Sequence, residues 1–508
     1  MSLRNKVIDI KSLKKLKDKF KRKKIVLCHG VFDLLHVGHI NYFQSAKKLG
    51  DILVVSATDD KFVNKGPGRP AFTINNRLKF LKEINCIDYV CVSNDFTAEK
   101  IIRNLKPNFY CKGSDYSIKS IKKDKNLKKE IDALKINGGK FNTIKEPSFS
   151  SSKYINENEL QNINQECKKF LNSLRNEFEQ NEIYKFLNNI KNKKVLIIGE
   201  TIIDKYITTE AIGKSGKEPM MVVQQKKQIK FLGGVGYIAN LCSSFVKETK
   251  MISFLGDKNS EKKYVLNNLN KKIIHNFLVK KNSPTIVKTR YLDDYRKTKM
   301  LGVYALNDNL ISKQEESKLF QLLKSNLNKY DIVIVADYGH GIITEKIRNL
   351  IMKYSNKLFL NTQINSFNRG YHSVFKYKKM NSYIINESEL RYEMKDRSSD
   401  LEFLTKKLSK KISLKNIIVT KGRWGADLFN IKNKSVISCP AFNENTIDTV
   451  GAGDTFFALS SLTLGSKVNN KIGLLISSLA ASYSINQLGN ISTFNFDILK
   501  KHLSHIFK

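Results

Sequence analysis

The stretch HGVFDLLHVGH, residues 29–39, decides the fold of the first part of the chain. It follows the apolar run KKIVLCHG (23–30), which predicts a buried first strand of a parallel sheet. GVFD then predicts a turn, and a helix is expected to begin at residues 36–39. His36 and His39 are three residues apart, so they share one face of the first helical turn. Gly38 lets an anion approach the backbone, and helix amides with two imidazoles suit the α-phosphate of a nucleotide.

The segments that follow predict a doubly wound α/β domain. DILVVSAT (51–58) and DYVCVS (88–93) are further apolar runs, separated by stretches with helical spacing. Alternation of strands and helices is typical of a parallel sheet covered on both faces. The first domain is therefore predicted over residues 1–156, with a Rossmann-like fold.

A second α/β domain is predicted over residues 193–508. KKVLIIGE (193–200) has the same form as the first strand of the chain. Further apolar runs follow it: MISFLGD (251–257), DIVIVADYG (331–339), KLFLNTQ (357–363), SYIINESE (382–389) and NIIVTKG (416–422). Residues 219–234 and 284–304 alternate differently and predict antiparallel strands with one wet face, which could form a small sheet or lid.

Residues 157–192 predict a helical linker. Cys167, Phe170, Leu174 and Phe178 fall at steps of three and four, which indicates an amphipathic helix. It could pack on one domain as a connector or form a dimer with a second copy, and the repeat is too short to require a coiled coil.

Charge and cysteine content limit the binding partners and the cellular compartment that we expect. The 508 residues carry a formal net charge of +42, but the lysines are spread along the whole chain. We interpret this as compositional drift toward Lys, Ile and Asn and expect no nucleic-acid partner. Seven cysteines without C-x-x-C spacing favour a reducing compartment over disulfides or zinc. No signal peptide and no membrane span are evident, so a soluble cytoplasmic protein is expected.

A second glycine-rich motif, NTIDTVGAGDTFFA, occupies residues 445–458. Gly451 and Gly453 precede an apolar helix whose first amides would form an anion hole. Asp454 follows directly, where a carboxylate can accept the proton of a substrate hydroxyl during phosphoryl transfer. Glycine–aspartate turns are also common helix caps, so the surrounding sequence must show whether this turn is a binding site or only a cap.

GVFDLLHVGH resembles the signature of the nucleotidyltransferases that make CDP-glycerol, CDP-choline and ADP-heptose. KGPGRPAFTINNR (65–77), KGSDY (112–116) and FSSSKYI (149–155) resemble most the adenylyltransferase half of the bifunctional ADP-heptose synthases. The resemblance implies that His36 and His39 stabilise the α-phosphate as pyrophosphate leaves. It places these residues at the nucleotide, the triphosphate or the sugar: Gly30, Phe32, Asp33, Asp59, Lys65, Arg69, Arg77, Lys112, Asp115, Ser151 and Ser152.

The second half resembles the ribokinase-like carbohydrate kinases. DTVGAGDTF is nearly their C-terminal signature, GETIIDKYI (199–207) resembles their first strand, and KEPMMVV (217–223) resembles the lid of the heptose 7-phosphate kinases. The resemblance implies Asp454 as the catalytic base, and ATP with Mg²⁺ as cofactors. It implies sugar binding by Asp204, Gly233 and Gly234, nucleotide binding by Asn386, Glu389, Thr420, Gly422, Gly451, Ala452 and Gly453, and magnesium binding through Glu389.

Two positions and the domain order depart from those families. Tyr237 stands where the kinases have an asparagine after their glycine pair, and FLNTQ (359–363) replaces an aspartate–proline–lysine run. The nucleotidyltransferase part is N-terminal here, whereas the kinase usually comes first.

The leading hypothesis is a bifunctional enzyme of sugar-nucleotide synthesis. One domain would phosphorylate the anomeric hydroxyl of a sugar phosphate, a heptose 7-phosphate by resemblance, and the other would join a sugar 1-phosphate to a nucleotide, giving ADP-heptose for lipopolysaccharide or another surface glycan. The main alternative is a cytidylyltransferase for a polyol or sugar phosphate, fused to a divergent kinase. A third hypothesis is a basic nucleic-acid-binding or scaffolding protein on a retired kinase fold. A homodimer is expected from the lid strands.

Overall fold

The computed structural model describes residues 6–63, 70, 72–113, 125–144, 165–365, 367–442, 446–486, 488–489 and 494–507. The chain divides into two compact units, residues 1–162 and 163–508. Five predicted site residues lie outside the described residues: Lys65, Arg69, Asp115, Ser151 and Ser152.

The first unit contains a parallel sheet of six strands in the order β1-β4-β3-β2-β5-β6. Its strands are β1 (Val7–Ile8), β2 (Ile25–Gly30), β3 (Ile52–Thr58), β4 (Tyr89–Ser93), β5 (Phe109–Gly113) and β6 (Lys140–Ile144). Its helices are α1 (Ile10–Lys19), α2 (Val37–Lys47), α3 (Ile74–Lys82), α4 (Glu99–Leu105) and α6 (Lys125–Ile136), with the 3₁₀ turn η1 (Asp60–Phe62).

The sheet order explains where a ligand can bind. After β2 the chain adds β3 and β4 on one side, and then returns to place β5 on the other side. In open parallel sheets, ligands bind at the carboxyl ends of the strands where the order reverses. Every residue of β3 is buried, and separate hydrophobic clusters pack on the two faces of the sheet, which confirms the predicted doubly wound fold.

The second unit contains a nine-stranded sheet in the order β11-β10-β7-β14-β15-β16-β17-β18-β19, whose last two pairings are antiparallel. Its strands are β7 (Lys194–Gly199), β10 (Glu248–Lys258), β11 (Ile274–Pro284), β14 (Ile332–Asp337), β15 (Leu358–Thr362), β16 (Ser382–Asn386), β17 (Asn416–Thr420), β18 (Ala426–Asn430) and β19 (Ser435–Cys439). Its helices include α10 (Gly234–Ser243), α11 (Lys262–Asn268), α12 (Lys313–Asn326), α13 (Glu345–Met352), α14 (Glu387–Met394), α15 (Leu401–Ser409), α16 (Ala452–Gly465), α17 (Asn470–Ile485) and α18 (Phe496–Ile506). Short 3₁₀ turns lie at η2 (Leu327–Lys329), η3 (Ser355–Lys357), η4 (Val374–Lys376) and η5 (Gly422–Trp424).

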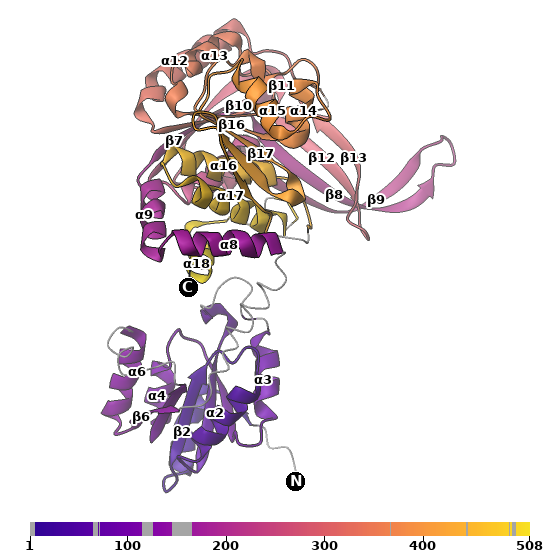
Figure 1. The fold of residues 1–508 in the computed structure, drawn as a ribbon. Helices are drawn as coiled ribbons and strands as arrows, with labels where there is room; N and C mark the ends of the chain where they lie inside the picture. Colours follow the sequence, from indigo (N-terminus) through magenta and orange to yellow (C-terminus); the bar gives the residue numbers. More distant parts are fainter. Residues whose placement is uncertain are drawn as a thin grey trace. The chain divides into compact units, whose positions relative to one another are not determined.

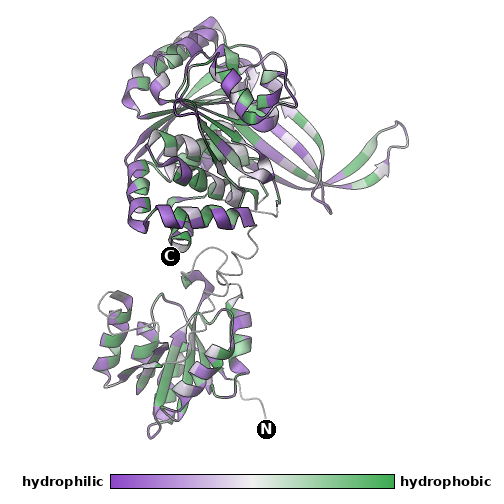
Figure 2. Cartoon of the chain, viewed as in Figure 1, coloured by the Kyte–Doolittle hydropathy of each residue, from purple (hydrophilic) through white to green (hydrophobic). Residues whose placement is uncertain are grey.

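Figure 2 shows that hydrophobic residues concentrate in the strands and on the inward faces of the helices. Strand β14 is buried along its whole length, as expected for a central strand covered on both faces. The uniformly apolar runs that predicted these strands therefore correspond to the middle of the sheet.

A second sheet of four strands forms the predicted lid, in the order β13-β12-β8-β9. Its members are β8 (Thr201–Lys214), β9 (Met221–Gly233), β12 (Ile286–Asp293) and β13 (Lys299–Ala305). Strand β8 begins directly after β7, and the distal part of the β8–β9 hairpin extends away from the body of the unit (Figure 1). Strand β12 likewise follows β11 directly, so two strands of the lid continue from strands of the nine-stranded sheet.

The predicted linker helix is two helices, α8 (Gln165–Glu177) and α9 (Gln180–Lys191), that pack on the second unit. Cys167, Phe170 and Leu174 are buried, as the spacing predicted, but the helix ends before Phe178. Glu179 and Glu182 form a capping box that starts a new helix there. Residues 165–191 are therefore part of the second unit.

Among the helices that the structure describes, none has the combined length and apolar character needed to span a bilayer.

Candidate active sites

In the first unit, the turn after β2 places His36 and His39 together. His36 is the N-cap of α2, and its Nδ1 accepts a hydrogen bond from the amide of Gly38 at 3.1 Å. The ring centroids of His36 and His39 are 4.1 Å apart, which confirms that they share one face. Partial burial lowers the pKa of His36. Two imidazoles at a helix N-terminus make a site for a phosphate whose charge develops during reaction.

His29, the third histidine of the motif, has a different role. It is buried in β2, with Nδ1 3.1 Å from the hydroxyl of Ser56 on β3. Burial, followed by the nearby Lys112, holds its pKa well below the usual value, so the ring is neutral. Lys112 is itself buried on β5, with Nζ 3.4 Å from the carbonyl of His29 and 3.7 Å from Glu130. Lys112 thus brings positive charge to the point where the strand order reverses.

Arg77, which was predicted to help hold the nucleotide, makes its described contacts within the protein. Its side chain is fully buried, and its guanidinium donates to the carbonyls of Val31, Thr58 and Phe72 at 2.5–3.0 Å. An ion pair with Asp60 at 2.6 Å completes its contacts. In this structure Arg77 joins the turn after β2 to the end of β3 and the β3–α3 connection, at the carboxyl edge of the sheet.

The other described residues that were predicted to bind the nucleotide shape the loops at this edge of the sheet. Phe32 has a positive φ of 47°, and a Cβ on Gly30 would lie 3.0 Å from the Phe32 ring. Asp33 is buried and accepts a hydrogen bond from the amide of Phe72 at 2.9 Å. Asp59 caps η1 at the end of β3 by accepting from the amide of Lys61. Strained backbone of this kind is typical of functional loops.

In the second unit, the start of α16 has the geometry predicted for an anion hole. Gly451 is the N-cap with a φ of +84°, a conformation that favours glycine. A Cβ on Gly453 would meet no atom within 4 Å, so open space lies above these amides. The loop lines a cavity of about 310 Å³ that also contains Asp454.

Asp454 is held by a tyrosine. Its Oδ1 accepts a hydrogen bond from the hydroxyl of Tyr338 at 2.8 Å, in the loop after β14. Burial raises the pKa of Asp454 to about 6, although Tyr338 lowers it and Asp204 raises it further. At neutral pH the carboxylate is therefore mostly ionised and can accept a proton.

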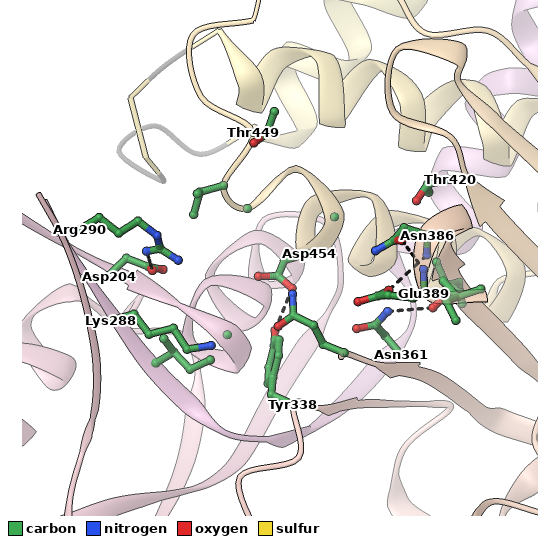
Figure 3. Close-up of a pocket in the computed structure, with 18 residues that line it drawn as sticks. Asp204, Lys288, Arg290, Tyr338, Asn361, Asn386, Glu389, Thr420, Thr449 and Asp454 are labelled. Atoms are coloured by element: carbon green, nitrogen blue, oxygen red, sulfur yellow. Dashed lines mark hydrogen bonds and ion pairs between the residues drawn. The ribbon is translucent and has the colours of Figure 1, made fainter. Parts of the chain in front are cut away.

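Asn386 and Glu389 lie on the opposite side of the cavity from the lid, with Asp454 between (Figure 3). Together they form a reciprocal capping box at the start of α14, so the N-x-x-E motif also has a local structural role. Burial raises the pKa of Glu389 to about 7. The Glu389 carboxylate and the Asn386 amide line the same cavity as the start of α16. Such oxygens fit Mg²⁺, which typically binds one or two carboxylates, substrate phosphates and water. When bound, the ion would neutralise charge on the transferring phosphate.

The lid contributes Asp204, from the buried part of β8. A Cβ on Gly233 would lie 2.3 Å from Oδ2 of Asp204, so glycine is required for this side chain to fit. Gly234, with a φ of +53°, begins α10 and lines the same cavity. The predicted sugar residues therefore come together at the base of the lid.

Sequence reasoning missed two cations beside Asp204. Lys288 and Arg290 alternate on β12, and both line the cavity from the lid (Figure 3). Arg290 forms an ion pair with Asp204, and Lys288 is opposite Asp204 in the strand register. Burial lowers the pKa of Lys288, and Asp204 partly opposes this effect. Period-two alternation in 284–304 was the signal that could have found them.

The structure also places the two segments that depart from the carbohydrate kinase pattern. Tyr237 is buried in α10, and its hydroxyl lies 2.7 Å from that of Thr455 on α16, so it packs behind Asp454 and is absent from the described cavity lining. Burial raises its pKa to about 12. Asn361 and Gln363, from the NTQ segment, do line the cavity.

A second cavity of about 420 Å³ adjoins the first, and the two share Thr420, Thr449 and Gly453. Its lining includes Gly422 and Ala452, which were predicted to contact the nucleotide. The anion-hole loop therefore stands between two connected cavities.

Comparisons with known proteins agree with this arrangement. The model of the pfkB family of carbohydrate kinases matches residues 192–490. The chain belongs to the pfkB carbohydrate kinase family. The cytidylyltransferase-like family model matches residues 27–158, so the chain combines a nucleotidyltransferase domain with a sugar kinase domain. Both are transferase domains, and pfkB kinases use ATP.

Curated proteins that are named as bifunctional are similar to parts of this chain. The "Bifunctional protein HldE" of Aliarcobacter butzleri (strain RM4018) is 27% identical over 305 residues, covering 59% of this chain and 62% of that protein. The "Bifunctional protein HldE" of Helicobacter pylori (strain ATCC 700392 / 26695) is 42% identical over 114 residues, 22% of this chain and 25% of that protein. Each match therefore spans less than two thirds of the relative.

Solved structures support the kinase fold. A ribokinase from Giardia lamblia aligns with a TM-score of 0.50 and 18% identity, covering 62% of this chain and 99% of that chain. Phosphofructokinase-2 from Escherichia coli gives a TM-score of 0.50 and 14% identity, covering 62% of this chain and all of the other. At these identities the likeness concerns the fold alone.

Proposed function

We propose that the kinase unit phosphorylates the anomeric hydroxyl of a sugar phosphate, a heptose 7-phosphate by resemblance. The observation that carries this proposal is the pair Lys288 and Arg290, which bring two cations from the lid into the cavity that holds Asp454. Two cations that line the same cavity as the anion hole suit a substrate that already bears a phosphate. Asp204 would bind sugar hydroxyls between these cations and the base.

Phosphoryl transfer uses the groups around α16. Asp454 takes the proton of the hydroxyl as its oxygen attacks the γ-phosphorus, and ADP leaves. The amides near Gly451 and Gly453 stabilise the transferring group. Glu389 and Asn386 would hold Mg²⁺, which would neutralise charge on the phosphates.

The first unit is proposed to transfer a nucleotidyl group from ATP to a sugar 1-phosphate. An oxygen of the sugar phosphate attacks the α-phosphorus, and pyrophosphate leaves as His36 and His39 neutralise the developing charge. Lys112 and Asp59, with the described turn residues Gly30, Phe32 and Asp33, would bound the nucleotide, and Lys65, Arg69, Asp115, Ser151 and Ser152 remain part of the same proposal. The product with a heptose would be ADP-heptose. Cytidylyl transfer to a polyol or sugar phosphate is the alternative.

Two assays on the full chain test these proposals. ADP release is measured with ATP, Mg²⁺ and heptose 7-phosphate, and pyrophosphate release is measured with heptose 1-phosphate and either ATP or CTP. We expect Asp454→Asn to lower kcat of the first reaction by about 10²–10⁴-fold. Pyrophosphate release with CTP but not ATP would establish the alternative, and no ADP release with any phosphosugar would refute the kinase proposal.

The lid hairpin is proposed to form a homodimer. Strand β9 is an edge strand, and Ile212, Met220 and Met221 are 54–69% exposed near the hairpin tip. Exposed apolar edges favour pairing with a second copy. Light scattering should give twice the chain mass for the wild type and for Val436→Ser, a control on β19, but a smaller mass for Ile212→Ser/Met221→Ser. An unchanged mass in the double variant would exclude this interface.

A further inference from the structure

The second cavity has the features of a site for a flat base. Trp424, Pro440, Phe456 and Ile485 give it apolar walls, and Gly453 joins it to the anion hole. A triphosphate that ends at the anion hole would place its base here, where apolar and aromatic surfaces bury it.

One wall of this cavity comes from outside the matched kinase region. Glu166, in the first turn of α8, is among the lining residues, whereas the family model begins at residue 192. Helix α8 is fixed against the cavity, because the thiol of Cys167 contacts the carbonyl of Ala441 at 3.1 Å. At its other end, Arg175 donates to the carbonyl of Ile506 at 2.6 Å, and Glu177 pairs with Lys471. Figure 1 shows α8 running beside α17 and α18.

The charged groups of the described lining are few. They are Glu166 and Arg423, and the guanidinium of Arg423 lies 4.8 Å from the centre of the Trp424 ring. The carboxylate of Glu166 is exposed and can accept hydrogen bonds but not donate them. It therefore complements an amino group on the edge of a base and repels a carbonyl.

We propose that Glu166 selects the purine base in the kinase unit, favouring a 6-amino group over a 6-carbonyl. This inference rests on the proposed kinase function, since it assigns the second cavity to the nucleotide. It makes the segment between the two matched regions a specificity element of the kinase.

Trp424 is the only tryptophan of the chain, so its fluorescence reports on this cavity without any turnover or sugar. The probes are ATP and ITP, which differ in having an amino group or a carbonyl at position 6. Dissociation constants are measured by titrating the full chain. We expect the wild type to bind ATP more tightly than ITP, and Glu166→Gln, whose amide can also donate, to reduce that preference by about tenfold.

Glu177→Gln is the matched control, because it makes the same change at the far end of the same helix. It should keep the wild-type ratio of ATP to ITP affinity. Fluorescence that responds to both nucleotides, with the same ratio in Glu166→Gln as in the control, would overturn the role of Glu166 and leave the kinase proposal standing. Fluorescence that responds to neither nucleotide would overturn both.

Discussion

Tyr338 and Asp454 are 116 residues apart in the sequence, and a single hydrogen bond joins them in the cavity. Glu200 positions this tyrosine, because its buried carboxylate accepts from the amides of Tyr338 and His340, each at 3.1 Å. Burial and the nearby Asp337 raise the pKa of Glu200 to about 8. The base therefore depends on a chain of contacts that begins at the end of β7.

The first prediction concerns the pH dependence of the kinase. Asp454 must be ionised to accept a proton, so kcat/KM should fall below a pH of about 6, its raised pKa. Tyr338→Phe removes a hydrogen bond that lowers this pKa, and the acid limb should move to higher pH. The measurement is kcat/KM between pH 5 and 9. Tyr377→Phe, which loses a similar bond to Asp337, should leave the limb in place; an identical profile in all three proteins would contradict the role of Tyr338.

At the scale of elements, the lid is joined to the anion-hole loop through Asp448. One carboxylate oxygen of Asp448 accepts from Lys299 of β13 at 2.7 Å, and the other accepts from the hydroxyl of Tyr206 on β8 at 2.6 Å. Burial alone would raise the pKa of Asp448, but the bonds from Lys299 and Tyr206 hold it below its usual value. Two lid strands thus hold the first residue of the DTVGAGD motif.

The second prediction follows from this contact. Lys299→Met should raise KM for the sugar substrate by about tenfold, because the loss of a charge-assisted bond loosens the lid over the cavity. Lys297→Met is the control, since Lys297 pairs only locally, with Asp294. The measurement is KM for the sugar substrate, obtained from steady-state kinetics of both variants. Equal KM values for both variants would show that the contact does not hold the lid for binding.

At the scale of the whole molecule, each unit has its own central sheet and its own core, and the second unit also has the lid sheet. His36 and His39 lie in the first unit, and Asp454 with its supporting residues lies in the second. The described candidate catalytic side chains of each proposed reaction therefore belong to one unit.

The third prediction is that the two activities can be removed separately in the full chain. His36→Ala should lower pyrophosphate release by about 10²-fold or more and leave ADP release unchanged, whereas Asp454→Asn should do the reverse. The same preparations serve for both assays and control each other. Loss of both activities in either variant would show that the sites are coupled.

The sequence by itself predicted both α/β units, because buried parallel strands are continuous apolar runs and their lengths match β3, β7 and β14. It also predicted the paired histidines and the anion-hole glycines, since these sites are made by neighbouring residues at a strand–helix turn. The sequence indicated one amphipathic helix in residues 157–192, whereas the structure has two helices there, because a capping box starts the second. The burial of Arg77 follows from loop packing that no local pattern shows.

Only the tertiary structure decided what faces those motifs. Three residues reach the first cavity from parts of the chain far from these motifs: Lys288 and Arg290 from β12 and Tyr338 from the loop after β14. Glu166 reaches the second cavity from helix α8. Their residue types are common on protein surfaces and in cores, and no short-range sequence pattern marks them as site residues. Their roles arise because the lid sheet, the loop after β14 and helix α8 converge on the start of α16, and long-range packing alone determines that convergence.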